Sequence, residues 1–187
     1  DRAGALAAFA LAMKAAAKLG RRRFLRMEAK PNICVMQDIR FKDDEIPTYI
    51  SKIGRDLFTD GLIETMKQFE QAKNFGSLIV PKLKSVEAVR KRIAGADLQG
   101  NLFIRDVHER VQKVLEMSEA LSPRYHVVVA NPPYMGSKSM DDRLASWSEA
   151  HYPESRFDLF AMFMERNLLL ASKNGFVAMI TMQSWMF

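Results

Sequence analysis

The sequence predicts an α/β protein built on a doubly wound, parallel sheet, and three runs of residues support this fold class. Residues 125–130 and 176–181 are apolar and rich in β-branched side chains, which is typical of buried strands. Residues 157–172 lie between them, are dense in Leu, Met and Phe, and predict a buried helix with Phe157 and Phe160 in the core. Asn174 and Gly175 are expected to close that helix. The order strand, helix, strand favours parallel pairing.

The first forty residues predict a helix and then a strand. Residues 3–19 are strong helix formers, nine of them alanines, and Gly20 is a typical helix end. A basic cluster follows, made of Arg21, Arg22, Arg23 and Arg26. It predicts either a solvated helix end or a contact with phosphate. Residues 33–37 form a short apolar run that predicts a buried strand, with Asp38 at its C-terminal tip.

Residues 41–123 separate that strand from the one at 125–130 and predict an inserted, mainly helical region. Apolar residues recur at helical spacing over 59–74 and over 102–121. Ser85 can cap a short helix that ends at Gly95, and residues 77–80 predict a short strand. Residues 41–56 are polar without clear periodicity, and residues 135–153 predict a polar loop. We therefore expect residues 1–40 and 124–187 to form one core, interrupted by the 41–123 region.

Composition limits the classes of protein that fit. The 187 residues carry 28 basic and 22 acidic side chains, a formal net charge of +6, and the excess lies within residues 1–30. This charge is compatible with a polyanionic partner. A single cysteine, Cys34, excludes an internal disulfide framework and offers no metal site, so we expect a cytoplasmic protein. The longest apolar run, residues 3–13, is too short to cross a bilayer, so no membrane association is expected.

The segment Asn131-Pro132-Pro133-Tyr134, called the NPPY segment below, directly follows the predicted strand at 125–130. The two prolines restrict φ at successive positions and remove two backbone donors, and Asn131 is driven to extended geometry. The resulting turn offers the Asn131 side-chain carbonyl and the Pro132 backbone carbonyl as acceptors, beside the aromatic face of Tyr134. A turn that only leads the chain out of the sheet is the simpler alternative.

Two carbonyls beside an aromatic plane suit a planar ring that carries an exocyclic amino group. The carbonyls can accept both amino hydrogens while the ring stacks on Tyr134. This would localise the nitrogen lone pair and direct it at an electrophile without a strong base. Positioning of this kind is worth up to roughly 7–11 kcal/mol. The NPPY segment therefore predicts transfer of a group to an aromatic amine.

Residues 127–134 resemble the motif of S-adenosylmethionine-dependent amino-methyltransferases, above all the DNA adenine-N6 enzymes of restriction-modification and phage defence. The closer resemblance is to large single-chain enzymes of the PglX type from BREX phage-defence systems. Residues 1–3 followed by 6–14, and residues 131–136, 157–160 and 175–181, look like further motifs of that type. The resemblance implies a Rossmann-like methyltransferase sheet, partial because its first strands are missing, with S-adenosyl-L-methionine as cofactor.

The resemblance also implies roles for individual residues. Asn131 and Pro132 would hold the adenine N6 group, Pro133 would shape the turn, and Tyr134 would stack on a base extruded from double-stranded DNA. Lys138 and Arg143 are candidates for contacts with DNA phosphate, or belong to a solvated loop. Other phage-defence or restriction proteins are expected partners.

Asp38 matches the acid that binds the cofactor adenine in such enzymes. However, 93 positions separate it from Asn131, far more than the family's usual short connection. Either residues 41–123 are an insertion, or Asp38 only caps the end of a strand.

Two other functions fit the same residues. NPPY also occurs in enzymes that methylate protein glutamine or RNA guanine N2, although the inserted region and the PglX-like flanks argue against these. The chain could also be a non-catalytic nucleic-acid-binding module with a basic N-terminal region.

The resemblance places the glycine-rich cofactor turn before Asp1 and the DNA-reading domain beyond Phe187. We therefore expect the 187-residue chain by itself to transfer no methyl group. Incubation with labelled S-adenosylmethionine and adenine-containing DNA tests this, and clear methylation of the DNA would refute it.

Overall fold

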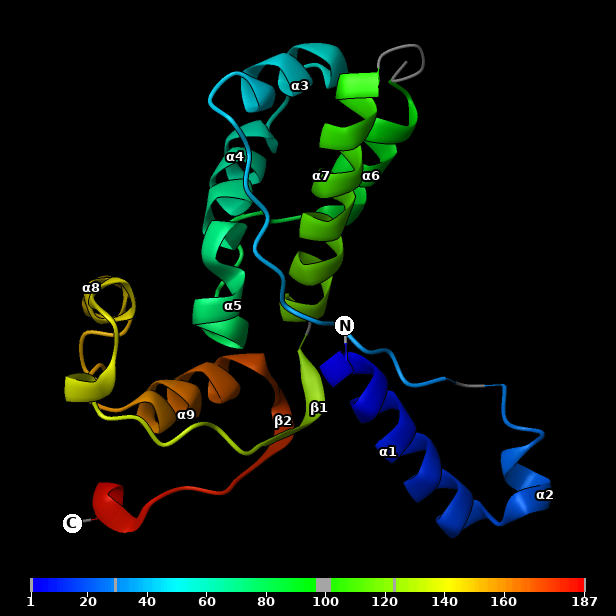
Figure 1. The fold of residues 1–187 in the computed structure, drawn as a ribbon, viewed down its shortest axis with the longest axis vertical. Helices are drawn as coiled ribbons and strands as arrows, with labels where there is room; N and C mark the ends of the chain where they lie inside the picture. The colour runs from blue at the N-terminus through cyan, green and yellow to red at the C-terminus, as the bar shows by residue number, and fades with distance from the viewer. Residues whose placement is uncertain (1, 29, 97–101, 123, 187) are drawn as a thin grey trace. The chain divides into compact units, whose positions relative to one another are not determined.

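The computed structural model describes residues 2–28, 30–96, 102–122 and 124–186, drawn with their helices and strands in Figure 1. The chain divides into two compact units, Asp1–Met36 and Gln37–Phe187. Asp1, where the resemblance to the methyltransferases begins, lies outside the described residues. The boundaries expected from sequence, 1–40, 41–123 and 124–187, stay a prediction.

The first unit consists of helix α1 (Arg2–Leu19) and the short helix α2 (Arg21–Phe24). Gly20 separates them with φ 73°, a conformation that L side chains rarely adopt. The predicted helix over 3–19 and its end at Gly20 are therefore confirmed. The four arginines of the basic cluster are exposed.

The predicted strand over residues 33–37 is wrong, because the described residues there have no strand pairing. Ile33 and Val35 lie instead against Gly4 of α1, where a Cβ atom would come within 2.7 Å of Val35 Cγ2. A short apolar run becomes a strand only if a neighbouring strand accepts its hydrogen bonds. Here the run has no ladder partner among the described residues, and the side chains of Ile33 and Val35 lie against a helix.

The second unit begins with a helical part that includes α3 (Glu45–Ile53), α4 (Thr59–Gln68), α5 (Ala72–Phe75), α6 (Val86–Ala94) and α7 (Leu102–Leu121). Helices α3, α4 and α6 each pack against α7 (Figure 1). Val107, Val111 and Val114 are fully buried on the inner face of α7. This stripe is the one that predicted a helix over 102–121, and the prediction is confirmed.

Three local predictions in this unit need correction. Helix α3 occupies part of the polar 41–56 stretch, and helix α8 (Asp142–His151) replaces most of the loop expected over 135–153. The strand expected over 77–80 is instead a 3-10 turn, Gly76–Leu78, followed by extended chain. The Ser77, Leu78 and Ile79 carbonyls accept hydrogen bonds from side chains, so no neighbouring strand is needed.

The sheet consists of two parallel strands, β1 (Tyr125–Ala130) and β2 (Ala171–Met179), joined through helix α9 (Leu159–Leu170). The predicted strand–helix–strand order and its parallel pairing are confirmed. The fold is thus mixed α/β and mostly helical. In parallel α/β sheets the loops after the strands form the ligand-binding edge, so the segment after β1 lies where a site is expected.

Gly175 lies inside β2 and does not close α9 as expected from sequence. The register slips there: Tyr125 pairs with Ala171, whereas Val127 pairs with Phe176. A Cβ atom on Gly175 would come 2.9 Å from the His126 carbonyl oxygen, so only glycine permits this close approach of the two strands.

The two faces of the sheet differ in burial. Val177 and Met179 of β2 face Met164 and Leu168 of α9. The opposite face carries the exposed side chains of Val127, Val129, Phe176 and Ile180.

Arg166 of α9 joins the helical part to the sheet. Its side chain is 3% exposed and donates to the carbonyls of Ser77 (2.9 Å), Ile79 (3.0 Å) and Leu121 (2.8 Å). Burial lowers the pKa of Arg166 from its ordinary value, but the three carbonyl dipoles replace the lost hydration of a guanidinium that stays charged. Tyr152 adds a bond from its hydroxyl to the Leu78 carbonyl at 2.6 Å.

Replacement of Arg166 by Met should strongly destabilise the second unit, because three carbonyls lose their charged donor. We expect a loss of about 3 kcal/mol in the free energy of unfolding, measured by urea denaturation. Arg105→Met, at an exposed position of α7, should change it by less than about 0.5 kcal/mol. Equal, small effects of the two variants would show that Arg166 does not hold the parts together.

Candidate functional site

The NPPY segment leaves β1 at the end of the strand farther from α7 (Figure 1). The last ladder bond runs from the Ile180 amide to the Ala130 carbonyl at 3.2 Å. Pro132 is buried, whereas Asn131 and Pro133 are exposed. Within the described residues, neither the Asn131 side-chain amide nor the Pro132 carbonyl has a hydrogen-bond partner. Neither of the two acceptors that the sequence predicts is thus used by the described part of the chain; Asn131 is exposed, whereas Pro132 is buried.

Tyr134 is 49% exposed and meets the ring of Phe160 edge to face, with centroids 6.3 Å apart and planes at 86°. Phe160 is buried at the start of α9, as expected from sequence. An edge-to-face contact favours one orientation of the Tyr134 ring. Because the contact is edge to face and half of the side chain is exposed, ring surface is left on which a planar ligand can stack.

The segment after Tyr134 is fixed by backbone bonds to the turn before α9. The Leu159 amide donates to the Met135 carbonyl, and the Ser137 amide donates to the Phe157 carbonyl, both at 2.9 Å. Gly136 and Asp158 form an antiparallel bridge between these bonds. Asp158 also caps α9 by accepting from the Phe160 amide at 3.2 Å. The position of the NPPY segment is therefore tied to the first turn of α9.

Lys138 and Arg143, the predicted phosphate contacts, are both exposed on the polypeptide that follows the NPPY segment. Lys138 lies in the 3-10 turn Ser137–Ser139, and Arg143 lies in the first turn of α8. Asp141 caps α8 by accepting from the Leu144 amide at 2.7 Å and also accepts from the Asn74 side chain. These two bonds, that of the Leu144 amide first, lower the pKa of the Asp141 carboxyl.

Asp38 lies away from the NPPY segment. Its carboxylate accepts from the Lys73 amide at 2.8 Å, in the first turn of α5, and the neighbouring Gln37 amide contacts Met117 Sδ near the end of α7. These contacts lie toward the start of β1, whereas Asn131 follows its other end, about 20 Å further on for a strand of six residues. The structure thus does not bring Asp38 together with the NPPY segment, and the cofactor role of Asp38 stays a prediction.

Sequence reasoning missed Phe157, which was expected in the core. Its side chain is 63% exposed, on the turn that the Ser137 amide contacts. The apolar density of 157–172 gave no sign of this, because α9 starts only at Leu159 and Phe157 precedes its cap.

The histidines and acids of the described residues form no group of three or more that could hold a metal ion. His108 Nδ1 lies 2.9 Å from the Tyr49 hydroxyl, and burial lowers the pKa of this histidine. No helix among the described residues has the length and apolar character needed to cross a membrane.

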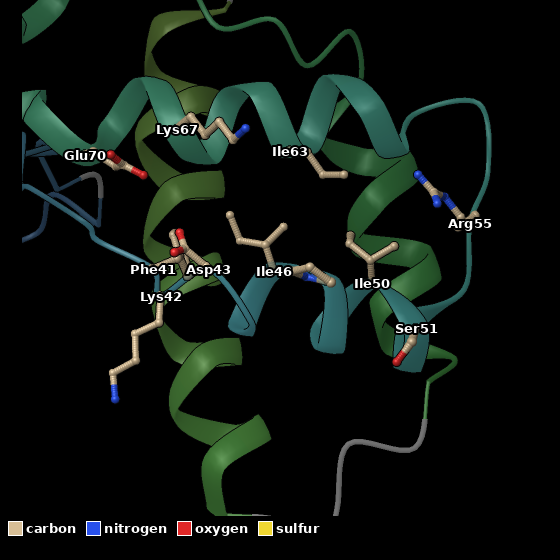
Figure 2. Close-up of a pocket in the computed structure, with 11 residues that line it drawn as sticks. Phe41, Lys42, Asp43, Ile46, Ile50, Ser51, Arg55, Ile63, Lys67 and Glu70 are labelled. Atoms are coloured by element: carbon tan, nitrogen blue, oxygen red, sulfur yellow. The ribbon is translucent and has the colours of Figure 1, made fainter.

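A separate cavity of about 420 Å³ lies between α3 and α4 and contains none of the predicted site residues. Figure 2 shows Ile46 and Ile50 of α3 pointing toward the side of α4 that carries Ile63. The segment at one end of this cavity is held by Glu45, which accepts from the Lys42 amide and from Arg110 at 2.8 Å each. The Arg110 hydrogen bonds lower the pKa of Glu45 to about 2.

Comparison with known proteins matches residues 2–187 to the family described as Eco57I restriction-modification methylase. The adenine-specific methyltransferase BrxX of Escherichia coli O9:H4 (strain HS) is 33% identical over 211 aligned positions, which include the whole of this chain and 17% of BrxX. The adenine-specific methyltransferase PglX of Lacticaseibacillus casei (strain Zhang) is 32% identical over 193 positions, with 16% of PglX covered. The chain thus spans about a sixth of the length of these relatives. On the family match over residues 2–187, it belongs to the Eco57I restriction-modification methylases.

Proposed function

We propose that this chain is the part of a DNA adenine-N6 methyltransferase that holds the target adenine, in restriction-modification or phage defence. The observation that carries the proposal is a pair of acceptors without partners among the described residues, the Asn131 amide oxygen and the Pro132 carbonyl, beside the half-exposed Tyr134 ring. Membership of the methylase family and similarity to two relatives named as adenine-specific support it.

The chain's own residues act by binding and orientation. The two carbonyl oxygens accept the two hydrogens of the adenine amino group, which turns the nitrogen lone pair away from the ring. Tyr134 stacks on the base after the base has left the duplex, since N6 cannot be reached inside it. Asn131 is freely accessible, and Pro132 and Pro133 keep the backbone rigid, so the acceptors need little reorganisation on binding.

S-adenosyl-L-methionine, when bound, supplies the electrophilic methyl group. The Asn131 and Pro132 carbonyls would hold the N6 lone pair toward that methyl group, and the proton lost from N6 would pass to water. In this proposal the Asn131 and Pro132 carbonyls contact the adenine amine. Asp38 binds the Lys73 amide instead. We therefore route no step of the reaction through Asp38.

Lys138 and Arg143 are proposed to contact DNA phosphates on either side of the extruded base. Both are exposed, and both follow the NPPY segment on polypeptide that is anchored to α9 or capped by Asp141. Contacts of this kind position the protein and carry no sequence information. A protein that modifies DNA in this way works in the cytoplasm of a bacterium, with other defence or restriction proteins as partners.

Methylation of protein glutamine or RNA guanine is the second candidate, because the same acceptors suit an amide or an amino group on another ring. The adenine-specific names of the two relatives favour DNA adenine. A nucleic-acid-binding module without activity would need neither free acceptor.

Asn131→Ala in the full-length protein should lower kcat for adenine methylation on the order of a hundredfold or more, because one of two amine acceptors is lost. DNA affinity and thermal stability should stay within about twofold and 2 °C of the wild type, since Asn131 is exposed and has no partner among the described residues. Transfer of labelled methyl groups to DNA, RNA and protein measures the activity.

The exposed Asn174→Ala, in β2, serves as the matched control and should retain full activity. Unchanged methylation by Asn131→Ala would refute the proposed role of the NPPY segment. Methyl transfer by the wild type to RNA or protein, with none to DNA, would show that the substrate is not DNA adenine.

Two variants separate the roles of Asp38. Asp38→Asn keeps an oxygen for the Lys73 amide, whereas Asp38→Ala removes it, so only Asp38→Ala should lower the free energy of unfolding, by about 1 kcal/mol. If Asp38 also binds the cofactor adenine, both variants should weaken S-adenosylmethionine binding about tenfold in calorimetry on the full-length protein. Unchanged affinity in both would leave Asp38 as a helix cap alone.

A further inference from the structure

We propose that Phe157 is the side chain that enters the DNA stack where the target base leaves it. This inference rests on the proposed function, because it assigns a second residue to the extrusion of adenine. Extrusion breaks stacking on both sides of the base and costs a few kcal/mol. Proteins that distort DNA lower such costs by inserting an apolar side chain between base steps.

Phe157 is exposed next to the segment that holds the base. The Ser137 amide donates to the Phe157 carbonyl, and the Gly136–Asp158 bridge places Tyr134 opposite Phe160, three residues after Phe157. Tyr134 is 49% exposed and Phe157 is 63% exposed, and backbone bonds link the segments that carry them. Phe160 lies between them in sequence but is buried.

The turn that carries Phe157 is anchored on both sides. Ser155 Oγ donates to Glu165 of α9 at 2.8 Å, and the Asp158 amide donates to the Ser155 carbonyl at 3.3 Å. Arg156 pairs with Glu149 of α8. A side chain that must push against stacked bases needs such a rigid base, because a mobile loop would yield instead.

Cations accompany the ring. The Arg156 guanidinium lies over the Phe157 ring, 4.8 Å from its centroid. Lys138 follows Ser137, whose amide contacts the Phe157 carbonyl, and is exposed. An exposed apolar ring with a cation against it suits a place between bases and the charged DNA backbone.

Phe157 could otherwise line the pocket that receives the extruded base. The two roles differ in one respect. A stack-filling side chain helps only while the target base must be removed from a stacked pair, so its loss is harmless once that base is already unpaired. A pocket wall contacts the extruded base in every substrate, so its loss affects all substrates alike.

The experiment compares Phe157→Ala with wild type in the full-length protein, on two DNA duplexes. In the first the target adenine is paired with thymine, and in the second it lies opposite an abasic site. We expect kcat/KM for methylation to fall about tenfold or more on the paired duplex and to stay within about twofold on the second. Phe157→Leu, which keeps an apolar side chain, should retain most of the activity on both.

Two controls keep the outcomes distinct. Leu57→Ala removes a side chain that is 92% exposed elsewhere in the same unit and should change neither rate. Asn131→Ala should lose activity on both duplexes, because it acts after the base has left the stack.

An equal loss on both duplexes for Phe157→Ala, or no loss on either, would overturn the assignment of Phe157 while the proposed methylation stands. Absence of adenine methylation by the wild type would overturn the proposed function and this inference with it.

Discussion

The buried guanidinium of Arg166 is the contact on which the arrangement of the second unit depends. It lies on α9 and binds carbonyls from two segments of the helical part, one at residues 77–79 and one at the end of α7. A cation removed from water needs several oriented acceptors, and carbonyls at the ends of turns and helices provide them. The same helix carries Phe160, which contacts Tyr134. One helix thus connects the helical part of the second unit to the NPPY segment.

The NPPY segment is a candidate binding site because two of its hydrogen-bond acceptors have no partner among the described residues. In most turns, polar groups at the end of a strand are satisfied by neighbouring backbone. Here the neighbouring bonds stop at Ala130 and resume at Met135, so that the Asn131 and Pro132 acceptors lie between two fixed points without partners among the described residues. Two prolines supply the rigidity that hydrogen bonds would otherwise provide. Rigid, unpaired acceptors are what an amine-binding site requires.

The aromatic residues near this segment differ in burial. Phe160 is buried and orients Tyr134, whereas Tyr134 and Phe157 are exposed to solvent. Phe157 and Phe160 lie three positions apart and are the same residue type, so the sequence alone could not separate the exposed ring from the buried one. The helix cap at Asp158 separates the two rings: α9 begins after Asp158, so Phe160 lies on the helix and Phe157 lies on the preceding turn.

Local signals in the sequence determined the elements whose patterns need no distant partner: α1 with its end at Gly20, α7 with its valine stripe, and the strand that delivers the NPPY segment. They also predicted the rigid turn at the NPPY segment, because two prolines restrict the backbone wherever they lie. Tertiary structure decided the rest. Residues 33–37 and 77–80 are strand-like in composition, but their neighbours are a helix and the side chains of α9 and Tyr152, so no ladder forms. Asp38 meets Lys73 for the same reason: a carboxylate binds the nearest free amide, and only the folded chain determines which amide is near.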